Sequence, residues 1–439
     1  MLTPEENIRL TETGPETAAG KVLRSYWQPV ALTEELDGER PVKAVTLMNE
    51  QLVLFKAADG EYRLSGRFCP HRGVDLSYGR LEADGLRCPF HGWLFDGKGH
   101  CLEQPAQPAG SNTHTLVKHP SYPCEERNGV IFAYLGDGEA PAFPALDCFT
   151  APASHVFAYK GLWYCNWLQA LEVGIDPVHA SFLHRFLADD SLDEAYGRQF
   201  RDEAVDSSMP LTKVLREFDC PEIRAEETDF GIRLLTLREI SEESTHVRVT
   251  NLLFPNAIVI PMSNEMVIAQ WHVPVDDESC YWYSMFISFG KPVNKELMRA
   301  QRIDMNPPPD YKPKYGPQNQ WGYNPDEQRD KTYTGMGDDI NVHDQWAVES
   351  PGPIADRSKH QLMRSDIGIM RYRRMLFKAM DAAEADSHDA LPMSSDVTRI
   401  RGPVAIDEIG PADDWQNCWK ERDLKRRQQS GWADDPWQE

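Results

Sequence analysis

The sequence predicts an α+β protein in two parts: a small all-β module, then a larger domain in which helices flank an antiparallel sheet. Two observations lead to this prediction. Residues 41–135 consist of short alternating runs separated by Asp-Gly and Asn-Gly turn signals. A proline-containing linker follows at 141–152, and beyond it helix-like and strand-like patterns are mixed. We therefore expect domains at residues 1–150 and 151–439.

A helix signal opens the chain. At residues 3–6 a threonine in the N-cap position precedes a proline at the first helical position and two acids in the first turn. We expect a helical approach over residues 1–27. Within the β module, the clearest strand-like runs are residues 42–48 and 51–55.

In the second part, an apolar helical pattern covers about residues 166–186. Strand-like runs follow at 232–237, 246–250, 257–260 and 281–287. Residues 303–339 are rich in Pro, Asn, Gly and Tyr and predict a long loop, which in a compact domain is usually functional, disordered or part of a subunit contact. A helix at about 358–385 and a polar tail with four tryptophans complete the prediction.

Charge and hydrophobicity exclude several classes of protein. The chain has 46 Lys and Arg against 69 Asp and Glu, a net charge of −23, so we expect no nucleic-acid partner. No stretch approaches the ~18 consecutive apolar residues of a membrane span, so we expect no membrane association. The first residues show neither the basic region nor the apolar run of a secretory signal, so we expect a cytoplasmic protein.

The nine cysteines are odd in number, and with no visible export signal a disulfide framework is disfavoured. Two of them stand in paired motifs, Cys69 with His71 and Cys88 with His91, in the pattern C-x-H … C-x-x-H. Two Cys and two His can hold tetrahedral Zn²⁺ or a [2Fe–2S] cluster with two His on one iron. The single spacer in C-x-H favours the cluster. We expect the other seven cysteines to be small buried residues: Cys101, Cys124, Cys148, Cys165, Cys220, Cys280 and Cys418.

A second constellation lies in the helical pattern that follows the linker. Asp176 and His179 are three residues apart and share a helix face, whereas His179 and His184 lie about 140° apart on a regular helix. Both imidazoles reach one metal only if the helix is distorted or ends between them, and Gly174 and Pro177 favour such a break. Two imidazoles and a carboxylate form the facial triad of non-haem Fe(II) oxygenases. The alternative is an amphipathic helix with two polar-facing histidines.

These motifs resemble those of a known family. Cys69-Pro-His-Arg-Gly and Cys88-Pro-Phe-His-Gly-Trp93 resemble the two ligand boxes of Rieske proteins, and the His-Gly-Trp ending resembles Rieske non-haem iron oxygenases. The later segment resembles the D-x-x-H-x-x-x-x-H helix of their α subunits. Its lead-in, Asn166 to Glu172, is most similar to the phthalate dioxygenase-like branch, which includes aryl O-demethylases. Val173 stands where the family often has Asn, so no role for an Asn carries over.

The resemblance implies two cofactors and their ligands. A Rieske [2Fe–2S] cluster would be held by Cys69, His71, Cys88 and His91. A mononuclear Fe(II) in a helix-grip-like catalytic domain would be held by His179, His184 and a distant acid. By resemblance this acid is Asp344, although spacing alone leaves Asp338, Asp339 and Glu349 open. His343 is not included, because adjacent side chains on a helix point apart. Asp356 and Arg357 are expected to form an ion pair or a cap.

Asp176 has a separate expected role. A carboxylate three residues before a ligating histidine is placed to accept a hydrogen bond from its ring and orient it. In the family, the matching Asp also connects that histidine to the second cluster histidine of a neighbouring subunit. Carried over, Asp176 would contact His179 in its own chain and His91 of another. This requires a head-to-tail ring, so we expect a homotrimer or a dimer of trimers.

The resemblance implies a reaction of O₂ with an aromatic carboxylate: ring dihydroxylation as in phthalate dioxygenases, with monohydroxylation and O-demethylation of a methoxylated acid as alternatives. A remote alternative is a non-catalytic Rieske or zinc-binding protein for electron transfer or binding. An acidic substrate needs a cation, and of Arg201, Arg233, Arg238 and Arg248 we favour Arg248. The chain has no G-x-G-x-x-G fingerprint, so a separate NADH-dependent flavin/iron–sulfur reductase must supply electrons, directly or through a ferredoxin.

Overall fold

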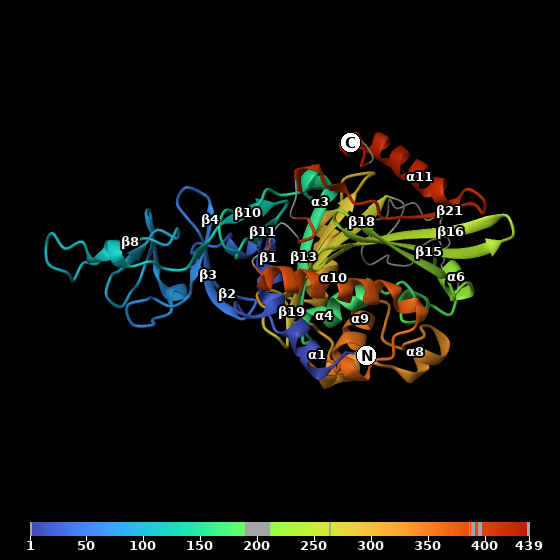
Figure 1. The fold of residues 1–439 in the computed structure, drawn as a ribbon, viewed down its shortest axis with the longest axis horizontal. Coiled ribbons are helices and arrows are strands. Elements are labelled where there is room, and N and C mark those ends of the chain that lie inside the picture. Colours follow the sequence, from blue (N-terminus) through green and yellow to red (C-terminus); the bar gives the residue numbers. More distant parts are fainter. Residues whose placement is uncertain are drawn as a thin grey trace.

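The computed structural model describes residues 2–188, 211–262, 265–385, 387, 391–393 and 397–436 (Figure 1). A narrow β module, on the left of Figure 1, projects from a larger domain in which helices lie against a broad sheet. This architecture confirms the predicted α+β class. Among the helices that are described, none is both long enough and apolar enough to cross a bilayer.

The first two helices are α1 (Pro4–Thr11) and α2 (Ala18–Arg24). Thr3 and Glu6 form a capping box at the start of α1: the Glu6 N–H donates to Thr3 Oγ1 at 3.1 Å, and the Thr3 N–H donates to Glu6 Oε2 at 2.7 Å. The predicted helix start is therefore confirmed. Both helices pack against α4 or α10 of the larger domain, although they precede the β module in the sequence.

The β module contains three antiparallel sheets, with strand orders β2-β3-β4-β9, β5-β6-β7-β8 and β1-β11-β10. Its strands are β1 (Gln28–Leu32), β2 (Val42–Leu47), β3 (Glu50–Lys56), β4 (Tyr62–Gly66), β5 (Arg80–Glu82), β6 (Gly85–Arg87), β7 (Leu94–Phe95), β8 (Cys101–Glu103), β9 (Ser121–Tyr122), β10 (Cys124–Arg127) and β11 (Val130–Ala133). A separate small core lies under the predicted cluster loops, formed by Val53, Phe55, Cys69, Leu76, Leu86, Cys88, Phe95 and Cys101.

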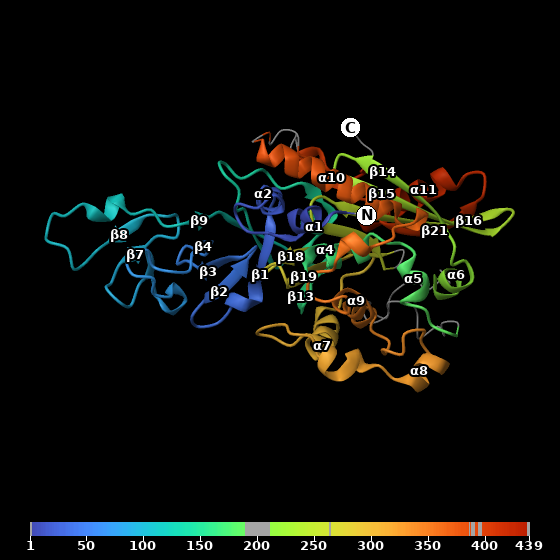
Figure 2. The ribbon, with the colours of Figure 1, turned by 60° about the horizontal axis from the view of Figure 1, so that its bottom comes forward.

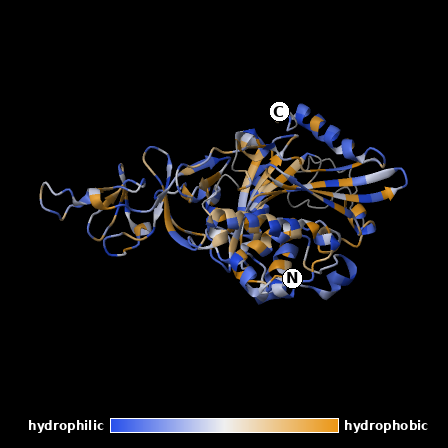
Figure 3. Ribbon diagram, in the orientation of Figure 1, coloured by the Kyte–Doolittle hydropathy of each residue, from blue (hydrophilic) through white to orange (hydrophobic). Residues whose placement is uncertain are grey.

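The larger domain is built on an eight-stranded antiparallel sheet in the order β13-β19-β18-β17-β16-β15-β14, with β21 paired to β16. Its strands are β13 (Val156–Trp163), β14 (Glu222–Thr228), β15 (Gly231–Ser241), β16 (Ser244–Leu253), β17 (Ala257–Pro261), β18 (Met266–Pro274), β19 (Cys280–Ser288) and β21 (Ile406–Pro411). Figure 3 shows the hydrophobic residues concentrated in these strands and on the helices beneath them. Two short strands, β12 (Ala145–Leu146) and β20 (Arg401–Gly402), form a parallel pair.

The remaining helices cover the sheet and its edges. They are α3 (Asp147–Thr150), α4 (Trp167–Gly174), α5 (His179–Phe182), α6 (Leu211–Glu217), α7 (Lys295–Met305), α8 (Pro325–Asp330), α9 (Ile340–Glu349), α10 (Ile367–Glu384) and α11 (Trp415–Ser430). α4 contacts β17, β18 and β19, and α10 contacts β14 and β15. α9 lies against α4 (Figure 2). α4 thus lies on the sheet just before the segment with His179 and His184, and it contacts α9, which bears Asp344.

Three expectations about elements need correction. The stretch 303–339 is not one long loop, because it includes α8 and a 3₁₀ turn at Pro317–Gly322. The helix expected from about 358 begins only at Ile367, after two 3₁₀ turns. The tail is not merely polar. It contributes β21 to the main sheet and α11 to a small core around Trp419, long-range partnerships that local sequence patterns do not reveal.

The cysteine expectation also needs one correction. Cys101, Cys148, Cys165 and Cys280 are buried, as expected, and Cys124 and Cys418 are partly buried. Cys220 is exposed, because it follows α6 in a surface turn. All nine cysteines are free thiols, which agrees with the rejection of a disulfide framework.

Candidate functional site

The first predicted ligand loop follows β4. The Cys69 N–H donates to the Val74 carbonyl at 2.9 Å, and the Gly73 N–H donates back to the Cys69 carbonyl at 2.8 Å. Gly73 has φ +71°, in the left-handed region that favours glycine. The loop is thus a closed turn that directs the side chains of Cys69 and His71 from one short segment.

The second loop, between β6 and β7, repeats this arrangement. The Cys88 N–H donates to the Trp93 carbonyl at 2.8 Å, and the Gly92 N–H donates to the Cys88 carbonyl at 3.0 Å. Gly92 has φ +73°, matching the glycine of the first loop. Two copies of one turn therefore present one Cys and one His each.

The side chains of these loops meet in two pairs, Cys69 beside Cys88 and His71 beside His91. Cys69 and Cys88 are both 2% exposed, and burial raises the pKa of the Cys69 thiol to about 11, with the neighbouring Cys88 adding to the rise. The rings of His71 and His91 lie 4.4 Å apart between centroids, and Trp93 stacks on His71 at 4.6 Å. His91 Nδ1 is buried without a hydrogen-bond partner. A soft metal centre bound by two thiolates and two imidazoles fits this arrangement.

The second constellation is assembled at a helix break. Backbone contacts of α4 end near Ile175, and α5 begins at His179, so Asp176 and Pro177 occupy the break that sequence spacing requires. His184 follows the end of α5. Asp344 lies in α9, far along the chain. The structure brings the ligand atoms of His179, His184 and Asp344 within 4.8 Å of one another.

The distances within this triad suit a small cation. Asp344 Oδ1 lies 3.2 Å from His184 Nε2 and 3.7 Å from His179 Nε2. Metal–ligand bonds of about 2.1 Å at right angles would place neighbouring ligand atoms about 3 Å apart. Asp344 Oδ1 is buried and has no hydrogen-bond partner, so this oxygen suits a cation bound between the three ligand atoms.

The positions of the protons on the His179 and His184 rings also favour a cation between the three ligand atoms. His179 Nδ1 donates to the main-chain carbonyl of Asp176, and His184 Nδ1 lies 3.3 Å from His343 Nδ1. With their Nδ1 atoms occupied, both rings turn an Nε2 lone pair toward Asp344. Burial lowers the pKa of His179, and burial followed by Arg248 lowers the pKa of His184 to about 3, so both rings are neutral near pH 7.

Asp344 completes the set of facing lone pairs. Burial raises the pKa of this carboxyl to about 6, against the opposing effect of His179. At neutral pH it is therefore ionised. Three electron-pair donors that face one another without a shared proton repel each other, and a divalent cation between them removes that repulsion.

The acids that spacing left open take other roles. Asp338 pairs with Lys331 at 2.7 Å, and Asp339 caps α9 and pairs with Arg302 at 3.0 Å. Glu349 accepts hydrogen bonds from Tyr164 N and Trp321 Nε1, as well as from Gln345. Within the described part of the chain, His179, His184 and Asp344 are the one group of at least three side chains close enough to share a metal ion.

The carboxylate of Asp176 differs from the sequence expectation. The ring of His179 is held by the Asp176 main-chain carbonyl, and not by its carboxylate. The carboxylate Oδ1 accepts from the Val178 N–H at 2.9 Å and from the His179 N–H at 3.4 Å, in the turn that precedes α5. Oδ2 makes no hydrogen bond to any described residue. Asp176 and His179 both line an outer cavity of about 710 Å³ and an inner cavity of about 70 Å³.

The inner cavity lies between the triad and the sheet. Its lining combines apolar side chains from β17, β18 and β19 with polar Arg248, Thr250, Gln270 and Asn341. The outer cavity is walled by residues of the 303–339 stretch, including Trp321, Tyr323 and Tyr333. A substrate that enters from outside would thus meet the triad between an aromatic wall and a mixed polar and apolar one.

Of the four candidate arginines, Arg248 is the one that lines the inner cavity among those described, whereas Arg201 lies outside the described residues. Arg248 Nη1 donates to Asp407 at 2.6 Å and Nη2 to the Pro261 carbonyl at 3.1 Å. Arg233 contacts Glu226 at 3.7 Å, and Arg238 donates to the Phe218 carbonyl at 2.9 Å. Asp407 and the Pro261 carbonyl orient the Arg248 guanidinium, which retains three further N–H groups.

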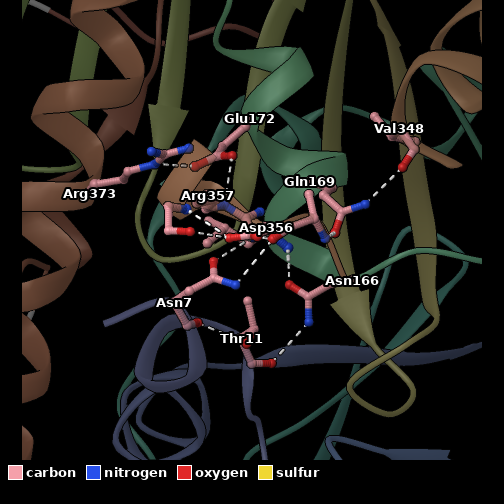
Figure 4. A network of polar contacts seen from close by, with 12 residues as sticks. Asn7, Thr11, Asn166, Gln169, Glu172, Val348, Asp356, Arg357 and Arg373 are labelled. Carbon is pink, nitrogen blue, oxygen red and sulfur yellow. Dashed lines mark hydrogen bonds and ion pairs between the residues drawn. The ribbon is translucent and has the colours of Figure 1, made fainter. Parts of the chain in front are cut away.

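A buried ionic network holds α4, the helix that precedes the segment with His179 and His184 (Figure 4). Glu172 accepts from Arg357 Nε at 3.1 Å and from Arg373 Nε at 2.6 Å. Arg357 is fully buried, and Asp356 caps its turn by accepting from the Ser358 N–H at 3.1 Å. The expectation of an ion pair or cap at these two residues is confirmed.

The same network joins distant segments. Asn166 Nδ2 donates to the Thr11 carbonyl at 2.9 Å, and Asn7 Nδ2 donates to the Ala355 carbonyl at 3.1 Å. Gln169 Nε2 donates to the Val348 carbonyl at 2.8 Å, which ties α4 to α9 (Figure 4). α4, which leads into the segment with His179 and His184, is therefore fixed by polar contacts relative to α9, which carries Asp344.

Sequence reasoning missed two residues of these sites. Trp93 was considered only as part of a motif, yet its ring lies flat against His71. His343 was left out as a ligand, and it does not join the triad. It instead contacts the far side of the His184 ring. An imidazole directly before a predicted ligand was the available signal, but its target lies in another helical segment and only the fold reveals it.

Comparison with known families identifies both parts of the chain. Residues 26–123 match the Rieske [2Fe-2S] domain, and residues 133–418 match the family described as LigXa C-terminal domain like. The second match covers more than half of the chain. The two matched ranges contain the two candidate metal sites, one in each.

Individual relatives agree with these matches. The chain is 35% identical over 408 residues to the phthalate 4,5-dioxygenase oxygenase subunit of Pseudomonas putida, covering 88% of each chain. It is 30% identical to the 5,5'-dehydrodivanillate O-demethylase oxygenase subunit of Sphingobium, covering 87% of this chain and 81% of that one. The solved structure of a QL mutant of NdmA from Pseudomonas putida CBB5 with theobromine shares the fold, with a TM-score of 0.58 and 21% identity, covering 86% of this chain and 96% of that one.

Proposed function

Since the chain belongs to the Rieske non-haem iron oxygenases, as an oxygenase component with a Rieske domain and a mononuclear-iron catalytic domain, we propose that it oxidises an aromatic carboxylate with O₂. The observation that carries the proposal is the convergence of three lone pairs, from His179, His184 and Asp344, beside a cavity. Membership of this enzyme family also removes the alternative of a non-catalytic Rieske or zinc protein.

The residues assigned to each cofactor fit it. Cys69, His71, Cys88 and His91 would hold the Rieske cluster, since two buried thiols meet two imidazoles, one with an unpaired Nδ1. The facing lone pairs of the triad would hold Fe(II). When bound, the cluster would supply single electrons at a raised potential, and the iron would supply a site for O₂ activation. The chain itself supplies the neutral rings, the ionised carboxylate and the apolar wall around them.

Electron transfer between subunits is part of this proposal. The β module projects away from the larger domain, and β8 lies far from α9 in both views (Figures 1 and 2). The cluster of one chain is therefore poorly placed to serve its own iron. Asp176 and His179 both line the outer cavity, and Asp176 Oδ2 makes no hydrogen bond to any described residue, which suits an incoming His91 of a second copy. A head-to-tail trimer, alone or paired with a second trimer, satisfies this geometry.

The substrate is proposed to be an aromatic acid that binds with its ring near the triad and its carboxylate toward Arg248. The chain's net charge of −23 repels anions, so a local cation has to offset that field. Arg248 is held at the inner cavity by Asp407 and still has N–H groups to donate. The relatives named for phthalate, 3-chlorobenzoate and phenoxybenzoate dioxygenases support an aryl acid.

We propose ring dihydroxylation as the reaction. The ring and O₂ gain two electrons and two protons from NADH and H⁺, delivered by a separate flavin/iron–sulfur reductase, directly or through a ferredoxin, and both oxygen atoms enter the cis-diol product. O-demethylation is the second candidate, favoured by the similarity to the dehydrodivanillate enzyme. There one oxygen atom leaves as water, and the methyl carbon leaves as formaldehyde.

A substrate screen tests the proposal. The purified protein, supplied with NADH, a reductase and O₂, is incubated with phthalates, chlorobenzoates, phenoxybenzoates and methoxybenzoates. Ring dihydroxylation predicts a diol with no formaldehyde, whereas demethylation predicts formaldehyde equal to the phenol formed. Failure of every aromatic acid, together with turnover of a neutral aromatic, would contradict the substrate class.

The role of Arg248 needs a charge-balanced variant, because removing Arg248 alone leaves Asp407 buried without its cation. The pair Arg248→Gln with Asp407→Asn removes both charges together. We expect this double variant to raise the Michaelis constant for the acid by about 10-fold or more, the effect of losing about 1.5–3 kcal/mol of charged hydrogen bonding. An unchanged Michaelis constant would remove Arg248 from the substrate site.

A further inference from the structure

His184 meets a carboxylate at one nitrogen of its ring and a second imidazole at the other. Its Nε2 faces Asp344, and its Nδ1 lies 3.3 Å from Nδ1 of His343. The rings of His184 and His343 are nearly parallel, 25° apart with centroids at 5.5 Å. His343 is fully buried in α9, directly before Asp344 of the triad.

The hydrogen-bond partner of His343 Nε2 determines which nitrogen carries the hydrogen in His343 and in His184. His343 Nε2 lies 2.9 Å from the main-chain carbonyl of Gly337, an atom that can only accept. His343 Nε2 must therefore carry a hydrogen. In a neutral ring its Nδ1 then has a lone pair, which accepts the hydrogen of His184 Nδ1, and the lone pair of His184 is left on Nε2.

The acceptor at the end of this chain is itself held in place. The Gly337 N–H donates to Glu327 Oε1 at 2.8 Å, and the same Glu327 oxygen accepts from Thr332 Oγ1 at 2.8 Å. Gly337 has φ +78°, a left-handed conformation that glycine adopts without strain. The carbonyl is thus presented to His343 by a turn with defined contacts.

We propose that His343 is a positioning residue for the iron site: by accepting from His184 Nδ1 and donating to Gly337, it sets the tautomer and the ring orientation of His184. The inference rests on the proposed function, since it assumes that His184 Nε2 binds iron. The two rings of the triad differ here. His179 donates to a main-chain carbonyl, which no side-chain substitution removes, whereas His184 depends on the side chain of His343.

A matched pair of variants tests the role of His343. Gln and Met are similar in length and flexibility, but only the Gln side chain can accept from His184 and donate to Gly337. The measurements are the ferrous iron affinity of the mononuclear site, the electron paramagnetic resonance spectrum of its nitric oxide adduct, and the cluster absorbance as a check on folding. All three are read without turnover.

We expect His343→Met to lower iron affinity by about 10–100-fold and to change or broaden the nitric oxide adduct spectrum. We expect His343→Gln to stay within about threefold of the parent, with cluster absorbance unchanged in both variants. Equal iron affinity and equal spectra in the Met variant and the parent would overturn the proposal. Equal impairment of the Gln and Met variants would also overturn it, because packing and not hydrogen bonding would then be responsible.

A further variant separates this inference from the proposed function. His184→Ala removes the ligand itself. If His184→Ala binds iron as well as the parent, the assignment of the iron site is wrong, and the role of His343 is wrong with it. If His184→Ala is impaired while His343→Met is not, the iron site stands and only the role of His343 is overturned.

Discussion

The candidate cluster site takes its four side chains from residues 69–91, whereas the candidate iron site joins α5 to α9 across more than half of the larger domain's sequence. In the β module, each loop closes on itself through two backbone hydrogen bonds and a left-handed glycine. At the iron site, His184 depends on His343, and α4 is held by Arg357 and Arg373 through Glu172.

This difference matches what each site has to do. A site built from self-contained loops can stand at the edge of a projecting module, where His71 is exposed and can approach another protein. A site assembled from distant helices is enclosed by them, so water is limited and the ring orientations are fixed before the substrate arrives. Electron delivery favours the first construction, and oxygen chemistry favours the second.

The largest effects should come from removing one ligand in each site. We expect Asp344→Ala to lose the mononuclear iron and to lower activity on the order of 10³-fold, since several kcal/mol of metal assistance disappear. Its cluster absorbance should be unchanged. Cys88→Ser should lose the cluster colour and still bind one iron in the larger domain. Iron, sulfide and visible absorbance measure both; loss of the cluster in Asp344→Ala would contradict the independence of the two sites.

Asp176→Asn should produce the next largest effect. The Asn oxygen can still accept from the Val178 N–H, and the main-chain carbonyl that holds His179 is untouched. Both metal sites should therefore stay occupied. We expect turnover to fall by about 100-fold because the carboxylate that would connect two subunits is gone. Normal product formation by this variant would contradict the bridging role.

Mixed oligomers test directly whether electrons pass from the cluster of one subunit to the iron of another. Co-expressed Cys88→Ser and Asp344→Ala chains place an intact cluster and an intact iron on different subunits. With random 1:1 assembly of a ring, about one quarter of the subunit contacts pair a working cluster with a working iron, so about a quarter of the parent activity should return. No recovery would show that electrons stay within one chain and would contradict the trimer proposal.

The two sites also differ in how much of them the sequence could predict, because one lies in a single short segment and the other joins distant segments. The cluster loops were visible because their four residues and both glycines lie in one short segment, where spacing reflects geometry. For the iron site, the spacing of His179 and His184 required a helix break, which the structure shows at Asp176 and Pro177. Asp344 needed a family resemblance, because no local pattern distinguishes it from Asp339 or Glu349.

Other features were beyond local patterns altogether. The pairing of β21 with β16 joins residues 406–411 to residues 244–249, far apart in the sequence, and residues 401–411 carry no strong strand signal of their own. The acceptor for His179 was assigned to the wrong oxygen of Asp176, because residue spacing cannot distinguish a side-chain carboxylate from the main-chain carbonyl of the same residue. His343 is not one of the three possible ligands, and its contact with the His184 ring depends on the fold.

A smaller effect should follow from disturbing the support behind α4. Glu172→Leu would leave Arg357 and Arg373 buried without their carboxylate, at a cost of about 3–5 kcal/mol in unfolding free energy. Asp326→Asn breaks the exposed pair with Arg329 and should cost less than about 1 kcal/mol. Denaturant unfolding followed by tryptophan fluorescence measures both. Similar costs for the two variants would mean that the buried network does not support the domain.

The smallest effect should come from the cluster loops. Gly73→Ala forces a left-handed alanine, which costs about 1–2 kcal/mol, whereas Gly73→Asn should cost less because asparagine tolerates that conformation. A Cβ at residue 73 meets no atom within 4 Å, but one at residue 92 lies 3.2 Å from Pro105 Cγ, so Gly92→Ala adds a steric cost. We therefore expect the cluster colour, measured under a chelator, to fade fastest in Gly92→Ala, then in Gly73→Ala, then in Gly73→Asn. If all three variants fade as slowly as the parent, the two turns are not what holds the cluster ligands in place, and the self-contained construction of this site is wrong.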